Sequence, residues 1–490
     1  MTDSKFSSFF FQQNFQNSSS IRYAILAMLV ITSLASCEKN IENPEVYVSG
    51  KIVNPTGDYM ILRDYDQLSD SIVLDGQGRF KFEISDIAAG FFTIEHPAEY
   101  QTIYLSPGDS LSLRLNTRAF DESLAFTGTH AGENNFLIQE FVTIEERDRK
   151  LMASYQLEPM DFYNFIDSLQ QDRIMNLEQI AQERGYDQDF VALLKKTYEY
   201  NSWSRLERYA IAHYGKNEIL ESTRIPSLFY VHRKNHEIND LALLNHYTFR
   251  PYIRSLVSNQ ALINCARKHG SGKKVDRSSY EYAREKLNVI RKLFTNQSMI
   301  EFFAQDEIRN SIRTRKNATE IYDLLADFSR VSSNQKLNND ITAFASQYIK
   351  LEAGNKVPNI TLITHEQEEI KLKEVVSNLT IVYFWSTQQA DYMNRVHKVV
   401  DELRIKYPEI KYLGINVDLP SSEYKNLLQK SNFLITEEFQ IKNTKAVIEA
   451  LALRGKNRSM VLNGKLQIID PDINLFHYQI ETTLLGYLNR

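Results

Sequence analysis

The sequence predicts a multidomain α+β protein, with an N-terminal β-sandwich, a central helical region and a C-terminal α/β domain. Three observations support this prediction. The chain has 490 residues, which is too long for one ordinary hydrophobic core. Short strand patterns separated by turn residues fill 45–128, and helical periodicity fills 129–350. In 351–490, strands rich in Val, Ile and Leu alternate with helical patterns.

The composition is that of a globular protein, with 43% hydrophobic and 24% charged residues. The formal net charge is −5, and no dense block of Lys and Arg occurs along the chain. A protein that binds nucleic acid usually carries a marked basic surface. The sequence therefore predicts no nucleic-acid partner.

A lipoprotein signal peptide is predicted over residues 1–36. An arginine precedes a short apolar segment, 23–34, which is too short to span a bilayer comfortably and ends in small residues. The ending Leu-Ala-Ser-Cys37 resembles a bacterial lipobox. This resemblance implies cleavage before Cys37, lipid on that cysteine, and a tether over 37–44 that anchors the protein to a bacterial membrane, on its periplasmic or surface face. The alternative is a hydrophobic N-terminus whose cysteine is accidental.

The chain contains two cysteines, and lipid attachment would consume Cys37. Only Cys265 then remains, so we expect no intramolecular disulfide in the mature chain. Cys265 lies in a helical pattern, where a cysteine usually packs as a small apolar side chain. A reactive thiol is the less favoured alternative.

Seven short strands are predicted in the N-terminal domain, and together they indicate a small β-sandwich. They cover 46–53, 59–62, 71–74, 79–84, 91–94, 101–105 and 110–115. The turn sequence at 75–78, Asp-Gly-Gln-Gly, predicts a hairpin between the third and fourth strands. The motif Ser-Gly-Lys-Ile at 49–52 and the turn at 105–109 resemble the β-domain that precedes thioredoxin domains in Bacteroidota lipoproteins. That resemblance implies no catalytic residue here.

The central region has few glycines, and its apolar residues recur at intervals of three and four. One such helical face is formed by Tyr282, Leu287, Ile290, Leu293 and Phe294. The pattern predicts a helical domain that links its two neighbours. A partner-binding face on this domain is an alternative that the pattern leaves open.

The C-terminal domain begins with an extended segment and contains a predicted strand–helix–strand unit. The strand 379–385 is followed by a helix that ends near Tyr407, and then by the strand 410–417. Strands of this kind, joined by a helix, form a parallel pair. The buried face of the helix is predicted to hold Tyr392, Val396, Val399, Val400 and Leu403. A later hairpin at 460–469 and a closing helix at 481–489 complete the pattern.

Four short motifs occur in the order found in thioredoxin-like domains of TlpA-type envelope proteins. They are Gly354 with Val357-Pro358, Val-Tyr-Phe-Trp-Ser-Thr at 382–387, Gly-Ile-Asn-Val-Asp at 414–418, and Met-Val-Leu-Asn-Gly at 460–464. Residues 351–490 resemble this family. The resemblance implies a thioredoxin-like fold, in which a turn after the central strand carries two redox cysteines.

Three parts of the family's redox site are absent from this sequence. Gln389 and Tyr392 occupy the two cysteine positions, and thiol exchange requires a thiolate. Asn457 stands where the family has a cis-proline, so we expect a trans peptide bond there. Tyr383 occupies the strand position where the family often has a polar residue that handles protons. We therefore predict a degenerate thioredoxin-like domain without redox activity.

No other catalytic or cofactor motif is complete. His232 and His236 have the spacing of helical metal ligands but lack a third ligand, so we predict no metal site and no cofactor. The function predicted is that of a membrane-anchored envelope lipoprotein, a pseudoenzyme that binds a protein or peptide partner. Two alternatives remain: an oxidoreductase that uses Cys265 or a partner's cysteines, and a carbohydrate- or nutrient-associated surface lipoprotein whose β-sandwich binds the ligand.

Overall fold

The computed structural model describes most of the chain after the predicted tether. The described residues are 44–64, 69–96, 99–214, 225–234, 238–269, 275–315, 317–418, 424, 427–428, 431, 433–453 and 458–489. The predicted signal peptide at 1–36, together with Cys37, His236 and Asn457, lies outside them. None of the helices in the described ranges combines the length and apolar character that a membrane crossing requires.

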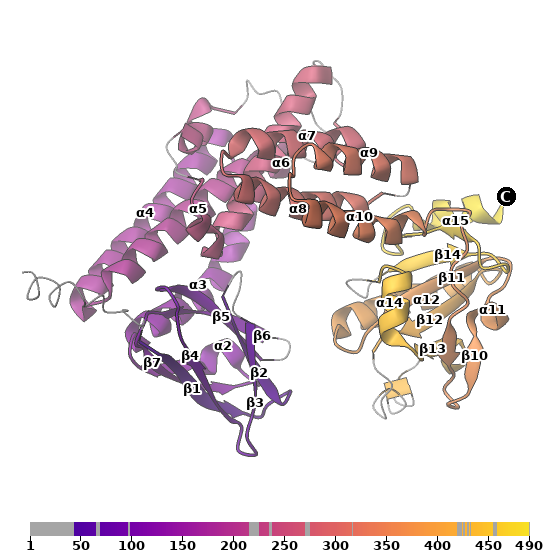
Figure 1. Cartoon of the computed structure of the whole chain (residues 1–490), viewed down its shortest axis with the longest axis horizontal. Helices are drawn as coiled ribbons and strands as arrows, with labels where there is room; N and C mark the ends of the chain where they lie inside the picture. The colour runs from indigo at the N-terminus through magenta and orange to yellow at the C-terminus, as the bar shows by residue number, and fades with distance from the viewer. Residues whose placement is uncertain are drawn as a thin grey trace, which may run out of the picture.

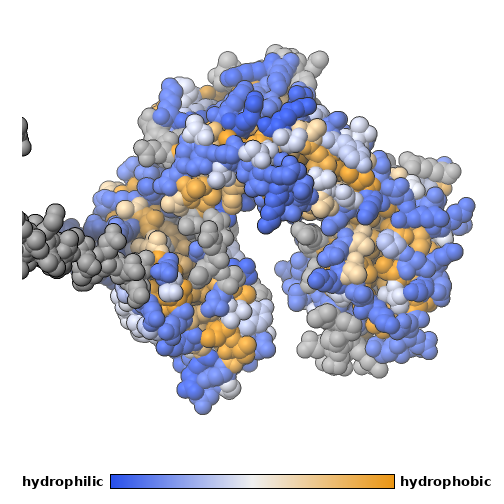
Figure 2. Space-filling view, in the orientation of Figure 1, coloured by the Kyte–Doolittle hydropathy of each residue, from blue (hydrophilic) through white to orange (hydrophobic). Residues whose placement is uncertain are grey.

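The chain is a mixed α/β protein, as the sequence predicts, with three β-sheets in its described part. Two four-stranded sheets contain strands β1 to β8, and a seven-stranded sheet contains strands β9 to β15. The helices α4 to α10 form the top of an arch in Figure 1, with β1 to β8 below its left end and β9 to β15 below its right end. Figure 2 shows open space between these two lower ends.

The N-terminal strands form two sheets that share one core. The strands are β1 (Val46–Val53), β2 (Tyr59–Arg63), β3 (Ser69–Val73), β4 (Arg79–Ile84), β5 (Gly90–His96), β6 (Glu99–Leu105), β7 (Ser110–Asn116) and β8 (Ala125–Gly128), with the short helix α2 (Phe120–Ser123) before β8. One sheet has the order β4-β1-β7-β8 and the other β3-β2-β5-β6. Val48 and Leu113 from the first sheet and Leu62 and Ile94 from the second are buried in one hydrophobic cluster. Apolar residues alternate along these strands because successive side chains point to opposite faces.

The prediction of a hairpin at residues 75–78 is wrong. Strand β3 pairs with β2, whereas β4 pairs with β1 in the other sheet. The turn is closed instead by Asp75, whose Oδ1 accepts hydrogen bonds from the backbone N–H groups of Gln77 and Arg79, both at 2.8 Å. The turn sequence reports only the local backbone conformation. It therefore predicts the reversal of the chain but not which strands pair on either side of it.

The middle of the chain is helical, as expected. Its elements are α3 (Ala131–Ser154), α4 (Pro159–Arg184), α5 (Gln188–Tyr214), η1 (Ser227–Lys234), η2 (Leu241–Asn245), α6 (Phe249–His269), α7 (Tyr280–Leu293), α8 (Gln297–Arg313), α9 (Ala318–Ser329) and α10 (Gln335–Ile349). The last four helices each begin after a residue whose side chain accepts a hydrogen bond from a first-turn N–H group. These N-cap residues are Ser279, Asn296, Asn317 and Asn334.

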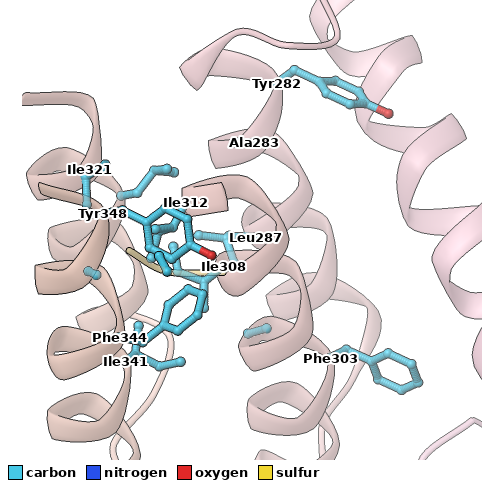
Figure 3. Packing of buried hydrophobic residues seen from close by; sticks show 14 of the residues in the cluster. Tyr282, Ala283, Leu287, Phe303, Ile308, Ile312, Ile321, Ile341, Phe344 and Tyr348 are labelled. Atoms are coloured by element: carbon cyan, nitrogen blue, oxygen red, sulfur yellow. The ribbon is translucent and has the colours of Figure 1, made fainter. Parts of the chain in front are cut away.

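The predicted apolar face of α7 packs inside this helical layer. Tyr282, Leu287 and Ile290 are buried, and Leu287 lies in one hydrophobic cluster with Ile308 of α8 and Phe344 of α10. Figure 3 shows side chains from these neighbouring helices pointing toward one another. Periodicity thus identified the buried face, because a helix stays in place mainly by burying one apolar stripe.

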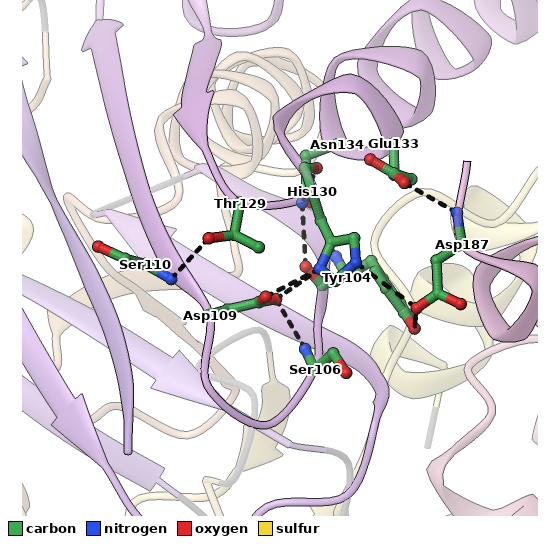
Figure 4. A network of polar contacts seen from close by, with 9 residues as sticks. All are labelled: Tyr104, Ser106, Asp109, Ser110, Thr129, His130, Glu133, Asn134 and Asp187. Carbon is green, nitrogen blue, oxygen red and sulfur yellow. Dashed lines mark hydrogen bonds and ion pairs between the residues drawn. The ribbon is translucent and has the colours of Figure 1, made fainter. Parts of the chain in front are cut away.

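A polar network joins the β1–β8 part to the helices (Figure 4). The side chain of Asp109, in the turn between β6 and β7, is buried, and its Oδ1 lies 2.8 Å from Nδ1 of His130 at the start of α3. Nε2 of His130 lies 3.5 Å from Oδ2 of Asp187, which precedes α5. The hydroxyl of Tyr104 in β6 donates to the same Asp187 oxygen at 2.9 Å. One imidazole therefore links two carboxylates that belong to different parts of the chain.

The C-terminal sheet has the order β10-β9-β13-β12-β11-β14-β15. Its strands are β9 (Thr361–Ile363), β10 (Glu369–Lys371), β11 (Thr380–Trp385), β12 (Lys411–Asn416), β13 (Glu438–Ile441), β14 (Ser459–Leu462) and β15 (Ile468–Asp470). Its helical segments are α11 (Leu372–Val375), α12 (Ala390–Lys406), η3 (Ile435–Glu437), α14 (Thr444–Ala450) and α15 (Ile480–Leu488).

The strand β11 is central, as the predicted strand–helix–strand unit requires. It runs parallel to β12, which follows α12, and antiparallel to β14, which leads into β15. The predicted hairpin and the closing helix are also present as β14–β15 and α15. The parallel pair, the hairpin and the closing helix thus occur in the order that the sequence predicts. On the face of α12 predicted to be buried, Val396, Val400 and Leu403 are buried, while Tyr392 and Val399 are only partly so.

The C-terminal sheet also packs against the helical layer. A continuous hydrophobic cluster includes Tyr348 of α10, Leu351 and the sheet residues Leu362 and Leu462. The guanidinium of Arg458 lies over the ring of Tyr348, 5.7 Å from its centroid. Arg458, directly before β14, therefore contacts the last helix of the middle region.

Candidate functional site

The turn between β11 and α12 is held by one carboxylate, that of Asp418. Its Oδ1 accepts a hydrogen bond from the Ser386 hydroxyl at 2.6 Å. Its Oδ2 accepts from the backbone N–H and the hydroxyl of Thr387, both at 2.7 Å, and from the Asn416 side-chain amide at 3.1 Å. Asp418 reaches the turn because β11 and β12 are parallel neighbours, with Trp385 opposite Asn416, so their carboxyl ends lie at the same edge.

These hydrogen bonds also fix the charge of Asp418. Burial by itself favours the neutral acid and raises the pKa of Asp418, but hydrogen bonds from Ser386 and Thr387 to the carboxylate outweigh burial. The pKa of Asp418 is consequently held below its ordinary value of 3.8. The turn is therefore organised by an anion at neutral pH.

The two positions that hold cysteines in the thioredoxin family lie together at the start of α12. Gln389 is the N-cap residue of α12, and its side chain makes no capping hydrogen bond. Tyr392 is half-buried, and its ring meets Phe476 edge-on with 5.9 Å between the ring centroids. Burial raises the pKa of Tyr392 to about 12. A hydrogen bond with Ser459 lowers this pKa, but its effect is smaller than that of burial. At neutral pH these positions thus present an amide and a neutral phenol.

Tyr383 lies beneath the turn and belongs to a buried cluster around Glu438. The Glu438 side chain is 0% exposed, and its two oxygens accept hydrogen bonds from the Tyr383 hydroxyl at 2.5 Å and from Nε1 of Trp385 at 2.9 Å. Nε2 of His397 lies 3.3 Å from Glu438 Oε1. A Cβ atom added at Gly414 would stand 2.2 Å from the carboxylate, so only glycine leaves room for it. Burial and the nearby Glu438 charge raise the pKa of Tyr383 far above its ordinary value.

His397 packs beside this cluster. Its Nδ1 lies 2.7 Å from the backbone oxygen of Met393, and a carbonyl oxygen only accepts, so Nδ1 carries a hydrogen. Its other nitrogen, Nε2, then faces Glu438. The imidazole also stacks on Phe433, with ring centroids 3.6 Å apart and an interplanar angle of 7°. The cluster is polar but enclosed by aromatic rings.

The sequence prediction found Tyr383 but missed its partners Glu438 and His397. Glu438 begins the strand Glu-Phe-Gln-Ile, whose alternation would place the glutamate on an exposed face although all four residues are buried. His397 follows a predicted core position on α12. One signal was available: a glycine inside a strand often marks a close approach by another group. Gly414 is such a glycine. It identifies the position of the approaching group but not the residue that supplies it.

Cys265, the other cysteine, lies far from this turn in sequence and is buried in α6. It is 1% exposed, and burial, together with the charges of Glu281 and Glu285, raises its thiol pKa to about 11. A buried thiol with a raised pKa is a poor nucleophile. This environment weighs against the oxidoreductase alternative that uses Cys265.

His232, one of the two histidines whose spacing resembles that of metal ligands, is accounted for by protein contacts. Nε2 of His232 lies 3.0 Å from Oε1 of Glu207, whose carboxylate also accepts hydrogen bonds from Arg233 and Asn259. Burial would raise the pKa of Glu207, but the hydrogen bonds and charges of Arg233 and His232 lower it to about 2. No group of three or more potential metal ligands occurs in the part of the chain that the structure describes.

The solved structures that this chain resembles include thioredoxin-like proteins of Bacteroides. A thioredoxin-like protein from Bacteroides caccae is 14% identical and covers 58% of this chain and 92% of its own, with a TM-score of 0.32. The thioredoxin domain of a thiol-disulfide oxidoreductase from Bacteroides vulgatus is 15% identical and covers 28% of this chain and 98% of its own, with a TM-score of 0.25. A thiol:disulfide interchange protein from Bacteroides sp. is 16% identical and covers 29% and 93%, with a TM-score of 0.25.

No protein-family model and no curated protein matches the sequence. At the identities and TM-scores given above, the similar structures assign no activity to this chain. The function must be argued from its own residues.

Proposed function

We propose that this protein is a membrane-anchored envelope lipoprotein whose thioredoxin-like domain binds a protein or peptide partner without thiol–disulfide exchange. The proposed domains are 45–128, 129–350 and 351–490, and the last of these contains no cysteine. The observation that carries the proposal is the turn before α12. Asp418 orders this turn, yet Gln389 and Tyr392 stand where an exchange reaction needs thiols.

The turn has properties that suit binding to a polypeptide. Thr387 and Gln388 are exposed, and they lie directly before the start of a 17-residue helix. The first N–H groups of a helix have no acceptor within the helix, so they favour carbonyl or carboxylate oxygens of a ligand. A peptide in an extended conformation presents such oxygens along its backbone.

An insulin-reduction assay tests the absence of exchange chemistry. Purified protein with dithiothreitol should reduce insulin no faster than dithiothreitol alone. The double variant Gln389→Cys/Tyr392→Cys places two thiols at i and i+3 at the helix start, and we expect it to gain measurable reductase activity. Turnover by the natural sequence would contradict the proposal, and loss of that turnover in Cys265→Ser would then establish the oxidoreductase alternative.

The membrane anchor is tested separately. Cells expressing the full chain should incorporate radiolabelled palmitate into the protein and retain it in the membrane fraction. The Cys37→Ala variant should lose both properties, because one residue provides the only attachment point in this proposal. Unchanged labelling of Cys37→Ala would refute the anchor without affecting the proposal for the C-terminal domain.

A further inference from the structure

A groove runs along the outer side of α12 and begins beside the degenerate turn. One wall is a stripe of α12 residues spaced by three and four, from Arg395 to Lys406, and the other is the segment 475–481 that enters α15. The groove has a volume of about 560 Å³. Tyr392, at one former cysteine position, touches Phe476 of this second wall. The groove is therefore continuous with the start of α12.

The two ends of the groove differ in chemistry. At the far end, Lys406 donates to Oε1 of Glu481 at 2.5 Å, and the Tyr407 hydroxyl donates to the other oxygen at 3.1 Å, so these charges are already paired. At the near end, Arg395 and Lys398 are exposed, and neither forms an ion pair among the residues that the structure describes. The near end thus offers two cations to a ligand.

Exposed aromatic rings belong to the second wall of the groove, and Phe476 lies at the near end. Tyr478 is 85% exposed and Phe476 is 38% exposed. The guanidinium of Arg395 lies over the Phe476 ring, 4.8 Å from its centroid. Exposed aromatic side chains next to arginine are typical of protein–protein contact sites, because rings supply apolar area at little entropic cost.

We propose that this α12 groove, defined by Arg395, Lys398, Phe476 and Tyr478, binds an acidic polypeptide segment of the partner. The inference rests on the proposed function and names the class of ligand. A carboxylate of the segment contacts Arg395 and Lys398, and a neighbouring apolar side chain packs on the two aromatic rings. The stripe from Arg395 to Lys406 is about 16 Å long at 1.5 Å per residue, which matches about five residues of extended chain.

The distribution of charge favours a short acidic segment over a uniform polyanion. Beyond Lys398 the groove is lined by Glu402 and then by Glu481. A nucleic acid would bring a phosphate to these carboxylates as well as to the cations, and like charges repel. A polypeptide with acidic residues at one end alone avoids that repulsion.

Site-specific photocrosslinking in the cell envelope tests the proposal on the full chain. Tyr478 is replaced by p-benzoylphenylalanine, and the crosslinked peptide is identified by mass spectrometry. The proposal expects one recurrent protein segment that contains Asp or Glu next to apolar residues. It also expects Arg395→Glu/Lys398→Glu to lower the crosslink yield about tenfold, since two favourable charge contacts become repulsive.

The matched control is Lys336→Glu/Lys350→Glu, in α10 and at its C-cap. It changes the net charge equally at two exposed residues outside the groove and should leave the yield unchanged. Equal losses in both variants, a crosslinked segment without acidic residues, a crosslink to nucleic acid, or no crosslink would each overturn the groove proposal. A second probe at Gln388 separates the two proposals. A partner captured there but not at Tyr478 refutes the groove and retains the proposed function, whereas no capture at either position refutes both.

Discussion

The hydroxyl of Tyr383 donates a 2.5 Å hydrogen bond to the carboxylate of Glu438 in the interior of the C-terminal domain. Burial of a carboxylate is unfavourable unless hydrogen bonds and opposite charges replace the lost water. Tyr383, Trp385 and His397 supply those partners. Tyr383, in the strand that leads to the degenerate turn, therefore has a structural role as a hydrogen-bond donor to a buried carboxylate.

Replacing Tyr383 with phenylalanine should destabilise the protein by about 1–3 kcal/mol, because a buried carboxylate oxygen loses its donor. The free energy of unfolding is measured by urea denaturation. Tyr407→Phe is the matched control, because its hydroxyl also donates to a carboxylate, that of the exposed Glu481. We expect a loss of less than about 0.5 kcal/mol for the control. Equal losses would show that burial of Glu438 does not set the cost.

Gly414→Ala should destabilise the protein, because the new Cβ atom would stand 2.2 Å from Glu438 Oε2. The cost expected for such overpacking is about 1–3 kcal/mol. Gly486→Ala provides the control: Gly486 lies in α15, and an added Cβ meets nothing within 4 Å. Alanine should be neutral or stabilise that helix by up to about 1 kcal/mol. Thermal unfolding of both variants measures the contrast, and a tolerated Gly414→Ala would contradict the packing described around Glu438.

Asp418→Asn should destabilise the protein in a pH-dependent way. The folded pKa of Asp418 lies below the ordinary 3.8 of the unfolded chain, so the carboxylate contributes its full stability above about pH 4. That contribution is lost as the pH falls through the folded pKa. The difference in urea midpoint between natural protein and variant should therefore be largest at neutral pH and shrink toward pH 2. A difference that stays constant with pH would mean that the charge of Asp418 does not hold the turn.

The thiol of Cys265 should react with Ellman's reagent only after unfolding. It is 1% exposed and its pKa is raised to about 11, so little thiolate reaches the reagent in the native state. Absorbance is followed in buffer and in guanidinium chloride with the Cys37→Ala variant, which leaves Cys265 as the one thiol. Rapid reaction of the native protein would revive the oxidoreductase alternative.

Local patterns in the sequence predicted most elements of the C-terminal domain. The burial of β11 and the helical stripe of α12 produce strong periodic signals, because each element buries a defined face. The prediction of a hairpin at residues 75–78 was wrong because strand pairing is not a local property. A tight turn depends on local backbone preferences, whereas the choice of sheet for β3 and β4 depends on residues elsewhere in the fold.

The candidate site was also predictable from the sequence only in part. The sequence by itself determined that Gln389 and Tyr392 replace two cysteines, since covalent chemistry depends on residue identity alone. Only the tertiary structure decided that Asp418 reaches Thr387, that Glu438 lies under Tyr383, and that Phe476 borders the start of α12. Each of these contacts joins residues more than 30 positions apart. No local preference encodes such a pair, because its position is fixed by how strands and helices pack.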